Sequence, residues 1–495
     1  MSLIWSTSLL TAGSLIGRCY GFFLRIILAR MLGAEGLGAY QMVLTFFMAV
    51  SGPFASALPV TVSRVVAAHR HEGINRRRLL LVATGLSAAG CALAVGTLLA
   101  FHQFRPVALL GQIERVTPWF WLIPAMALTL VAQAVRGYYL GINRVLPMVI
   151  SQHVEQLFEI AWLLVLSRLA VLVSPAQKIP LVIAGMTLAD LVNSLYLLAT
   201  MRGGEKQGLK PGRWQPGIVR EMIGLGLPFC LSRLVGSVSR VVEATLIPLC
   251  LVRSGMSGDR ALAVYGQVTG LALPMLFFPA MIITSLSSTL VPAVAESMKR
   301  PEVLARRIRQ GVSIGLMVGC GAAVLFCTRG SWLGVFLFAD QQAGEIMASL
   351  APVAIFWYLD IVTGNLLRGL GRPIVGMVSD VVGSALRIGY MLWSVVGGME
   401  TIRQAILTSS LLSAAINWAA VVILSSVSFD WYLWLLSPVL SGAAMAAILG
   451  TPVYALGPFA ILLQLGLALT AYIAVWFLLN LHPTRGEIFS IPTRR

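Results

Sequence analysis

The sequence predicts an all-α polytopic membrane protein with about fourteen membrane-spanning helices. Hydrophobic residues make up 58% of the 495-residue chain, 11% of its residues are charged, and the mean hydropathy is +0.86. Soluble globular chains carry about 25% charged residues and are less apolar. Apolar runs of about 20 residues, long enough to cross a bilayer, also follow one another along nearly the whole sequence.

Each apolar run is expected to form one helix, and the runs alternate with short polar connections. They lie near residues 3–30, 37–62, 79–101, 118–139, 147–167, 179–200, 218–248, 262–290, 311–328, 346–366, 373–395, 402–425, 431–451 and 455–479. The first run lacks the basic region and cleavage site of a signal peptide, so it is expected to remain in the protein. Prolines in PVTVS (59–63), LPM (273–275) and LVP (290–292) are expected to permit bends.

The distribution of basic residues predicts that both termini lie inside the cell. With a cytoplasmic N-terminus, the inside connections carry 22 of the 36 Lys and Arg residues, which agrees with the positive-inside rule. These residues are Arg64, Arg70, Arg76, Arg77, Arg78, Arg136, Arg144, Arg202, Lys206, Lys210, Arg213, Arg220, Lys299, Arg300, Arg306, Arg307, Arg309, Arg368, Arg372, Arg485, Arg494 and Arg495. Membrane topology therefore explains most of the net charge of +17, and a nucleic-acid partner is not expected.

No motif of an enzyme or a metal centre is present. The six cysteines are scattered through apolar runs, the five histidines show no metal-ligand spacing with them, and no HExxH, P-loop or GxSxG context occurs. We therefore expect no catalytic activity, no metal and no cofactor.

The first and seventh runs share a repeated pattern of arginines. Residues 18–29 (RCYGFFLRIILA) and 233–244 (RLVGSVSRVVEA) both read R-x-x-G-x-x-x-R-x-x-x-A. GAYQ at 38–41 and VYGQ at 264–267, and the Arg136 and Arg368 segments, repeat in the same order. The pattern predicts two parallel repeats: a lobe at 1–202, a linker at 203–217 and a lobe at 218–428. Two further helices (429–482) and a tail (483–495) follow.

The repeated arginines predict an anionic substrate. Arg18 and Arg25 fall on one helical stripe, and Arg233, Arg240 and Glu243 fall on another. Charged stripes inside a membrane face a water-filled cavity or the protein interior, and guanidinium groups suit phosphate oxygens. A competing interpretation is that each arginine reaches the membrane surface or forms a structural ion pair. Arg64 is a further candidate for gripping head groups.

Several carboxylates within the apolar runs are candidates for coupling transport to H⁺, Na⁺ or the membrane potential. Glu155 and Glu159 lie one turn apart, and Asp380 occupies nearly the position equivalent to Glu155 in the second repeat. Asp360 precedes Asn365 in the tenth run, as Asp190 precedes Asn193 in the sixth. The alternative is structural: Glu155 with a neighbouring arginine, or Asp380 with Arg387, would then form an ion pair that supports packing.

Four segments resemble a known family: LGAEGLGAYQMV, LPVTVSRVVAAHR, RGYYLGINRVLPMVISQHVEQ and LPFCLSRLVGSVSRVVEATLIP. They are similar to the polysaccharide-export branch of the MOP flippase superfamily, which contains stage V sporulation protein B and is related to MurJ-type lipid II flippases. The resemblance implies two six-helix lobes in a V and two extra helices that hold a lipid tail. It also implies a flippase in the plasma membrane of a sporulating bacterium, carrying an undecaprenyl-diphosphate-linked sugar for spore cortex peptidoglycan. Arg18 and Arg25 match cavity arginines of the relatives in position.

Two other functions remain open at the level of sequence. One is a cation-coupled exporter of small solutes or drugs, which would use Glu155, Asp360 or Asp380. The other is a scaffold for cell-wall synthases that transports nothing, for which the cytoplasmic loops would matter more than the arginines. A membrane glycosyltransferase is disfavoured because no external loop is long enough for a catalytic site.

Overall fold

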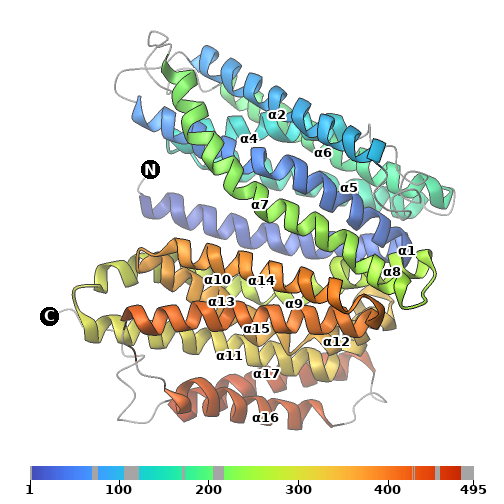
Figure 1. Cartoon of the computed structure of the whole chain (residues 1–495), viewed down its shortest axis with the longest axis vertical. Coiled ribbons are helices and arrows are strands. Elements are labelled where there is room, and N and C mark those ends of the chain that lie inside the picture. The colour runs from blue at the N-terminus through green and yellow to red at the C-terminus, as the bar shows by residue number, and fades with distance from the viewer. Residues whose placement is uncertain are drawn as a thin grey trace. The chain divides into compact units, whose positions relative to one another are not determined.

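The computed structural model describes residues 3–69, 76–104, 122–169, 173–203, 217–425, 427, 430–451 and 457–480. Within these ranges every regular element is a helix (Figure 1). Residues 204–216 of the predicted linker and the predicted tail at 483–495 lie outside the described residues. The all-α membrane class predicted from the sequence is thereby confirmed.

Contacts divide the chain into two compact units. Unit 1 comprises Met1–Pro248 with Ser257–Gly266, and unit 2 comprises Leu249–Met256 with Gln267–Arg495. This division by contacts does not test the predicted lobes, which stay predictions.

Unit 1 is built from long helices. They are α1 (Leu3–Ala68), α2 (Arg76–Phe104), α4 (Leu122–Gly141), α5 (Leu146–Leu169), α6 (Pro175–Gly203), most of α7 (Gly217–Arg253), and α8 (Gly258–Gly266). The first two apolar runs form the single long element α1, which is interrupted at Gly33 (φ 69°). A residue with a side chain rarely adopts this left-handed backbone, so glycine is suited to the break.

Unit 2 contains more broken helices. Its elements are η3 (Gln267–Ala272), α9 (Leu273–Phe277), α10 (Ala280–Ser297), α11 (Pro301–Leu333), η4 (Gly334–Phe338), α12 (Gln341–Leu350), α13 (Val353–Gly369), α14 (Pro373–Trp393), η5 (Val395–Gly397), α15 (Gly398–Ser425), η6 (Tyr432–Leu436), α16 (Ser437–Leu449) and α17 (Pro458–Asn480). The chain bends by 50° between Phe277 and Ala280, and by 58° between α12 and α13.

Where the structure describes them, the predicted apolar runs lie on one or more of these helices. In the described part of the chain, nine helices are long and apolar enough to cross a membrane, or eleven if each bent pair forms one span. One of the nine, Ser8–Ala68, covers residues 8–30 of the first predicted run and the whole of the second. The number fourteen therefore stays a prediction.

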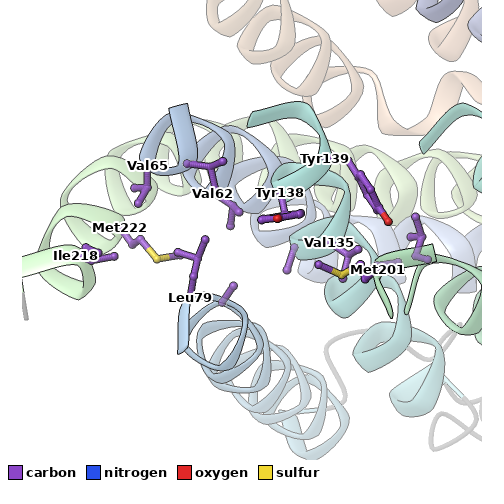
Figure 2. Close-up of a cluster of buried hydrophobic side chains, with 14 residues drawn as sticks. Val62, Val65, Leu79, Val135, Tyr138, Tyr139, Met201, Ile218 and Met222 are labelled. Carbon is purple, nitrogen blue, oxygen red and sulfur yellow. The ribbon is translucent and has the colours of Figure 1, made fainter. Parts of the chain in front are cut away.

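A cluster of apolar side chains fixes the start of α7 in unit 1. Ile218 and Met222 of α7 pack with Val62 and Val65 of α1 and with Leu79 of α2, and all five are nearly inaccessible to solvent (Figure 2). Tyr138 and Tyr139 of α4 belong to the same cluster, as do Leu197 and Met201 of α6. Helices in a membrane associate through van der Waals packing of this kind, so the cluster fixes the position of this end of α7.

The two GAYQ-like segments pack against each other within unit 1. A Cβ atom built on Gly38 would lie 1.9 Å from the carbonyl oxygen of Leu262, and one built on Gly266 would lie 2.4 Å from the Gly38 nitrogen. The backbones of α1 and α8 therefore approach at a distance that only glycine permits.

Replacing Gly38 with alanine is expected to lower the free energy of unfolding by about 1–3 kcal/mol, because the methyl group forces α1 and α8 apart. Thermal unfolding in one detergent measures the effect. Gly52→Ala is the matched control in the same helix, since nothing lies within 4 Å of its built Cβ; it should leave stability unchanged or slightly higher. Equal melting temperatures for the two variants would contradict the close packing.

Candidate functional site

The arginines of α1 lie on a side of the helix that is open. Arg18 and Arg25 are exposed. A Cβ atom built on Gly21, between them on the same stripe, would meet nothing within 4 Å. Gly13 and Gly17 lie on another side, where built Cβ atoms would contact Val149 and Gln156 of α5. Packing against α5 therefore leaves the Arg18 and Arg25 stripe uncovered within unit 1.

The matching arginines of α7 lie in an exposed section of that helix. Residues 231–236 are all exposed, in contrast to Ile218 and Met222 near the start of α7, which are buried. The Arg233 guanidinium carbon lies 5.6 Å from the centre of the Phe229 ring, and Arg240 Nη2 donates to Ser237 Oγ at 2.9 Å. Glu243 is half-buried one turn further on.

None of the ion pairs found among the described residues involves Arg18, Arg25, Arg233 or Arg240. The ion-pairing alternative therefore lacks support for these four side chains. Their N–H groups can donate hydrogen bonds to an anion without first releasing a carboxylate. Arg64, near the end of α1, is also exposed.

Unit 1 also contains a network of polar side chains between α4, α5 and α6. Arg136 Nη2 lies 2.7 Å from Glu155 Oε2 and 3.3 Å from Asn193 Oδ1. Asp190 accepts a hydrogen bond of 2.8 Å from the Thr129 hydroxyl. The Glu155 carboxylate is therefore engaged in an ion pair, which is the structural alternative that the sequence left open for it.

The same network extends towards the arginines of α1. Glu159 interacts electrostatically with Glu155 and Asp190, and the buried Tyr40 interacts with both Glu159 and Arg25. These acids therefore lie close to the part of α1 that carries Arg25.

Unit 2 holds a comparable set on α13, α14 and α15. Asn417 Nδ2 donates to Asp360 Oδ1 at 2.8 Å, and Arg368 Nη1 donates to Asn365 Oδ1 at 2.7 Å. Asp380 interacts electrostatically with Asp360, Arg368 and Arg387. In contrast to Glu155, the carboxylate of Asp360 is bound by a neutral amide, and the Oδ1 atom of Asn417 is buried without a hydrogen-bond partner.

The two sets occupy equivalent helices of the predicted repeats. Each combines an arginine, an acid and an asparagine, from the fourth to sixth and tenth to twelfth predicted spans respectively. Sequence reasoning missed the hydrogen bond that Asn417 makes to Asp360. An asparagine inside the apolar run LLSAAINWAAV was the available signal for Asn417.

Within the described residues no cluster of His, Cys, Asp and Glu could hold a metal ion. The chemistry that the arrangement offers is thus binding of anions by guanidinium groups and binding of a proton or small cation by isolated carboxylates.

Comparison with known proteins agrees with this architecture. The model of a family described as polysaccharide biosynthesis protein matches residues 3–298. Stage V sporulation protein B of Bacillus subtilis (strain 168) is 25% identical over 400 residues, covering 77% of this chain and 76% of that protein.

Two solved structures share the fold. Lipid II flippase MurJ in an inward closed conformation gives a TM-score of 0.66 at 12% identity, covering 96% of this chain and 99% of that one. A multidrug resistance MATE family transporter of the MOP superfamily, in an inward-facing conformation, also gives 0.66, at 14% identity, covering 83% and 96%. These likenesses confirm the resemblance predicted from the sequence.

Proposed function

Because the chain belongs to the polysaccharide biosynthesis protein family, we propose that it flips an undecaprenyl-diphosphate-linked sugar precursor across the plasma membrane. The protein is a multi-pass membrane protein of the flippase and transporter type and not an enzyme. The proposed cargo is a lipid II-like precursor of spore cortex peptidoglycan, since the relatives include stage V sporulation protein B and a lipid II flippase.

The observation that carries the proposal is the set of four exposed arginines in a repeated pattern. Arg18, Arg25, Arg233 and Arg240 make no ion pair among the described residues. A diphosphate offers several anionic oxygens, and the planar donor fork of arginine binds two of them at once. A cationic drug would be repelled by the same side chains, so their charge favours the lipid-linked diphosphate over the drug exporter.

In this proposal alternating access brings the diphosphate to the arginines from each side in turn. Glu243 competes with the phosphate oxygens for nearby arginines as the cycle proceeds, and Arg64 attracts head groups at its end of α1. Residues 431–479, which contain η6, α16 and α17, hold the lipid tail. Both termini lie in the cytoplasm, and cell-wall synthases are partners that receive or supply the precursor.

Ion coupling is assigned to the carboxylates within the helices, and no cofactor is required. Glu155, Glu159, Asp360 and Asp380 are the candidates. Asp360 is the strongest candidate because its hydrogen-bond partner is the neutral amide of Asn417. The Oδ1 atom of the same amide is buried without a hydrogen-bond partner. A carboxylate in this setting can take up H⁺ or Na⁺ without breaking an ion pair.

Export of a small solute is the second candidate, because the MATE transporter shares the fold. Two features distinguish it from the flippase. A drug exporter would not be expected to line its path with positive charge, and its substrate would not need a lipid tail.

Reconstitution into liposomes tests the proposal. A fluorescent undecaprenyl-diphosphate sugar should reach the far leaflet in protein-containing vesicles but not in empty ones, whereas a cationic dye should not be transported. Asp360→Asn should abolish the response of the translocation rate to an imposed H⁺ or Na⁺ gradient and leave the rate without a gradient unchanged. Transport of the dye without translocation of the lipid would contradict the flippase proposal and support the exporter.

A further inference from the structure

Arg329 is a buried cation that the proposed transport cycle does not use. It lies in α11, is 2% exposed, and is the largest of the fully buried side chains among the described residues. Its Nη2 atom lies 2.5 Å from Leu449 O, 3.3 Å from Thr451 O and 2.6 Å from Gln464 Oε1. One guanidinium therefore joins α11 to the end of α16 and to α17.

These contacts complete the C-terminal end of α16. The last carbonyl groups of a helix have no partner within it and carry partial negative charge. Gln464, which is also buried, donates from Nε2 to Ile448 O at 2.6 Å and to Thr451 O at 3.0 Å. Arg329 and Gln464 together bind the carbonyls of Ile448, Leu449 and Thr451.

Further contacts attach the same two helices along α11. The Tyr472 hydroxyl donates to Met317 O at 2.6 Å. The Tyr472 ring packs against Gly321, where a built Cβ atom would lie 3.0 Å from the ring. A Cβ on Gly442 of α16 would lie 3.2 Å from Val324. Figure 1 shows α16 and α17 side by side, and both pack against α11. The attachment thus extends over several helical turns and ends at the Arg329 bonds.

We infer that Arg329 is a positioning residue that fixes α16 and α17 to α11 as one rigid body and so sets the response of the transporter to the length of a lipid tail. The part of this inference that concerns the lipid tail rests on the proposed function, whereas the attachment of α16 and α17 to α11 does not. The outward side chains of α17, including Leu463, Leu467 and Leu478, are apolar and exposed. A tail bound along them keeps its position relative to unit 2 only if the two helices do not move separately.

The first measurement is amide hydrogen exchange of the full-length protein in nanodiscs. Arg329→Gln should raise exchange in α16 and α17 by about tenfold or more and leave α13 to α15 unchanged, because local opening becomes easier. Arg329→Lys keeps the charge but not the planar pair of donors, so its exchange rates should lie between those of wild type and Arg329→Gln. Arg403→Gln removes an exposed arginine of unit 2 and should change nothing in α16 and α17. Gln464→Met tests the same junction if Arg329→Gln does not fold.

The second measurement is the ratio of translocation rates for a long-tailed and a short-tailed diphosphate sugar. The ratio should fall several-fold in Arg329→Gln and recover in part in Arg329→Lys. Unchanged exchange in both Arg329→Gln and Gln464→Met would overturn the attachment. Raised exchange with an unchanged ratio would overturn the positioning role. Absence of translocation in wild type would count against the proposed function and the tail role, while exchange alone would still decide the attachment.

Discussion

Replacing Arg240 with alanine is expected to slow translocation of the lipid-linked diphosphate sugar by about 10- to 100-fold. A hydrogen bond to a charged group contributes about 1.5–3 kcal/mol, and 1.4 kcal/mol corresponds to a factor of ten. Arg240 is exposed on α7 and donates a hydrogen bond to the neutral Ser237 hydroxyl, so its charge is available to a phosphate. The rate at which the head group reaches the far leaflet of proteoliposomes measures the effect.

Two controls separate loss of binding from loss of structure. Arg240→Lys retains the charge without the planar fork and should restore only part of the rate. Arg220→Ala removes another exposed arginine of α7, 20 residues earlier and therefore about 200° around the helix. It should leave the rate unchanged.

The repeated arginine pattern predicts a second result in the same experiment. Arg18→Ala should reduce the rate as Arg240→Ala does, because both arginines belong to one repeated pattern. Wild-type rates in both variants would remove the repeated arginines from the site.

The fold was largely predictable because hydrophobicity determines which segments enter a membrane. The described part of each apolar run lies on one or more helices. The positions of the breaks between helices were harder to predict. Pro59 and Pro292 lie inside α1 and α10, whereas the 50° bend falls next to Pro279 and the 58° bend next to Pro352. A proline frees one carbonyl, but the packing of neighbouring helices decides whether the chain bends there.

The candidate site was predictable only where a repeat marked it. Arg18 and Arg240 were found because their pattern occurs twice. Counting charges placed Arg136 in a connection, whereas α4 continues to Gly141 and carries Arg136 within it. Its pairing with Glu155 depends on how α4 and α5 pack, which no local pattern encodes.

Replacing Arg136 with methionine is expected to lower the free energy of unfolding by about 3 kcal/mol. The Arg136 and Glu155 side chains are 14% and 27% exposed, and removing one partner of a buried pair leaves the other charge uncompensated. The value is at the low end for buried pairs because Glu155 is partly exposed. Reversible unfolding in mixed detergent micelles gives the free energy directly.

Glu155→Leu alone should cost a similar amount, but the double variant with Arg136→Met should recover most of the loss, since no unpaired charge remains. The exposed pair Glu400 and Arg403 is the matched control. Removing Arg403 there should cost far less, because an exposed ion pair contributes little to stability. Additive losses in the Arg136 and Glu155 double variant would show that the two side chains do not act as a pair.

The double variant also distinguishes a structural ion pair from a coupling site in unit 1. It retains packing between α4 and α5 but has no carboxylate at position 155. If coupling resides at Asp360, where the carboxylate is bound by an amide, the double variant should still accelerate in an H⁺ or Na⁺ gradient. If Glu155 takes up the ion after releasing Arg136, the same variant should fold and flip lipid yet no longer respond to the gradient. Proteoliposomes with and without an imposed gradient therefore assign coupling to one unit or the other.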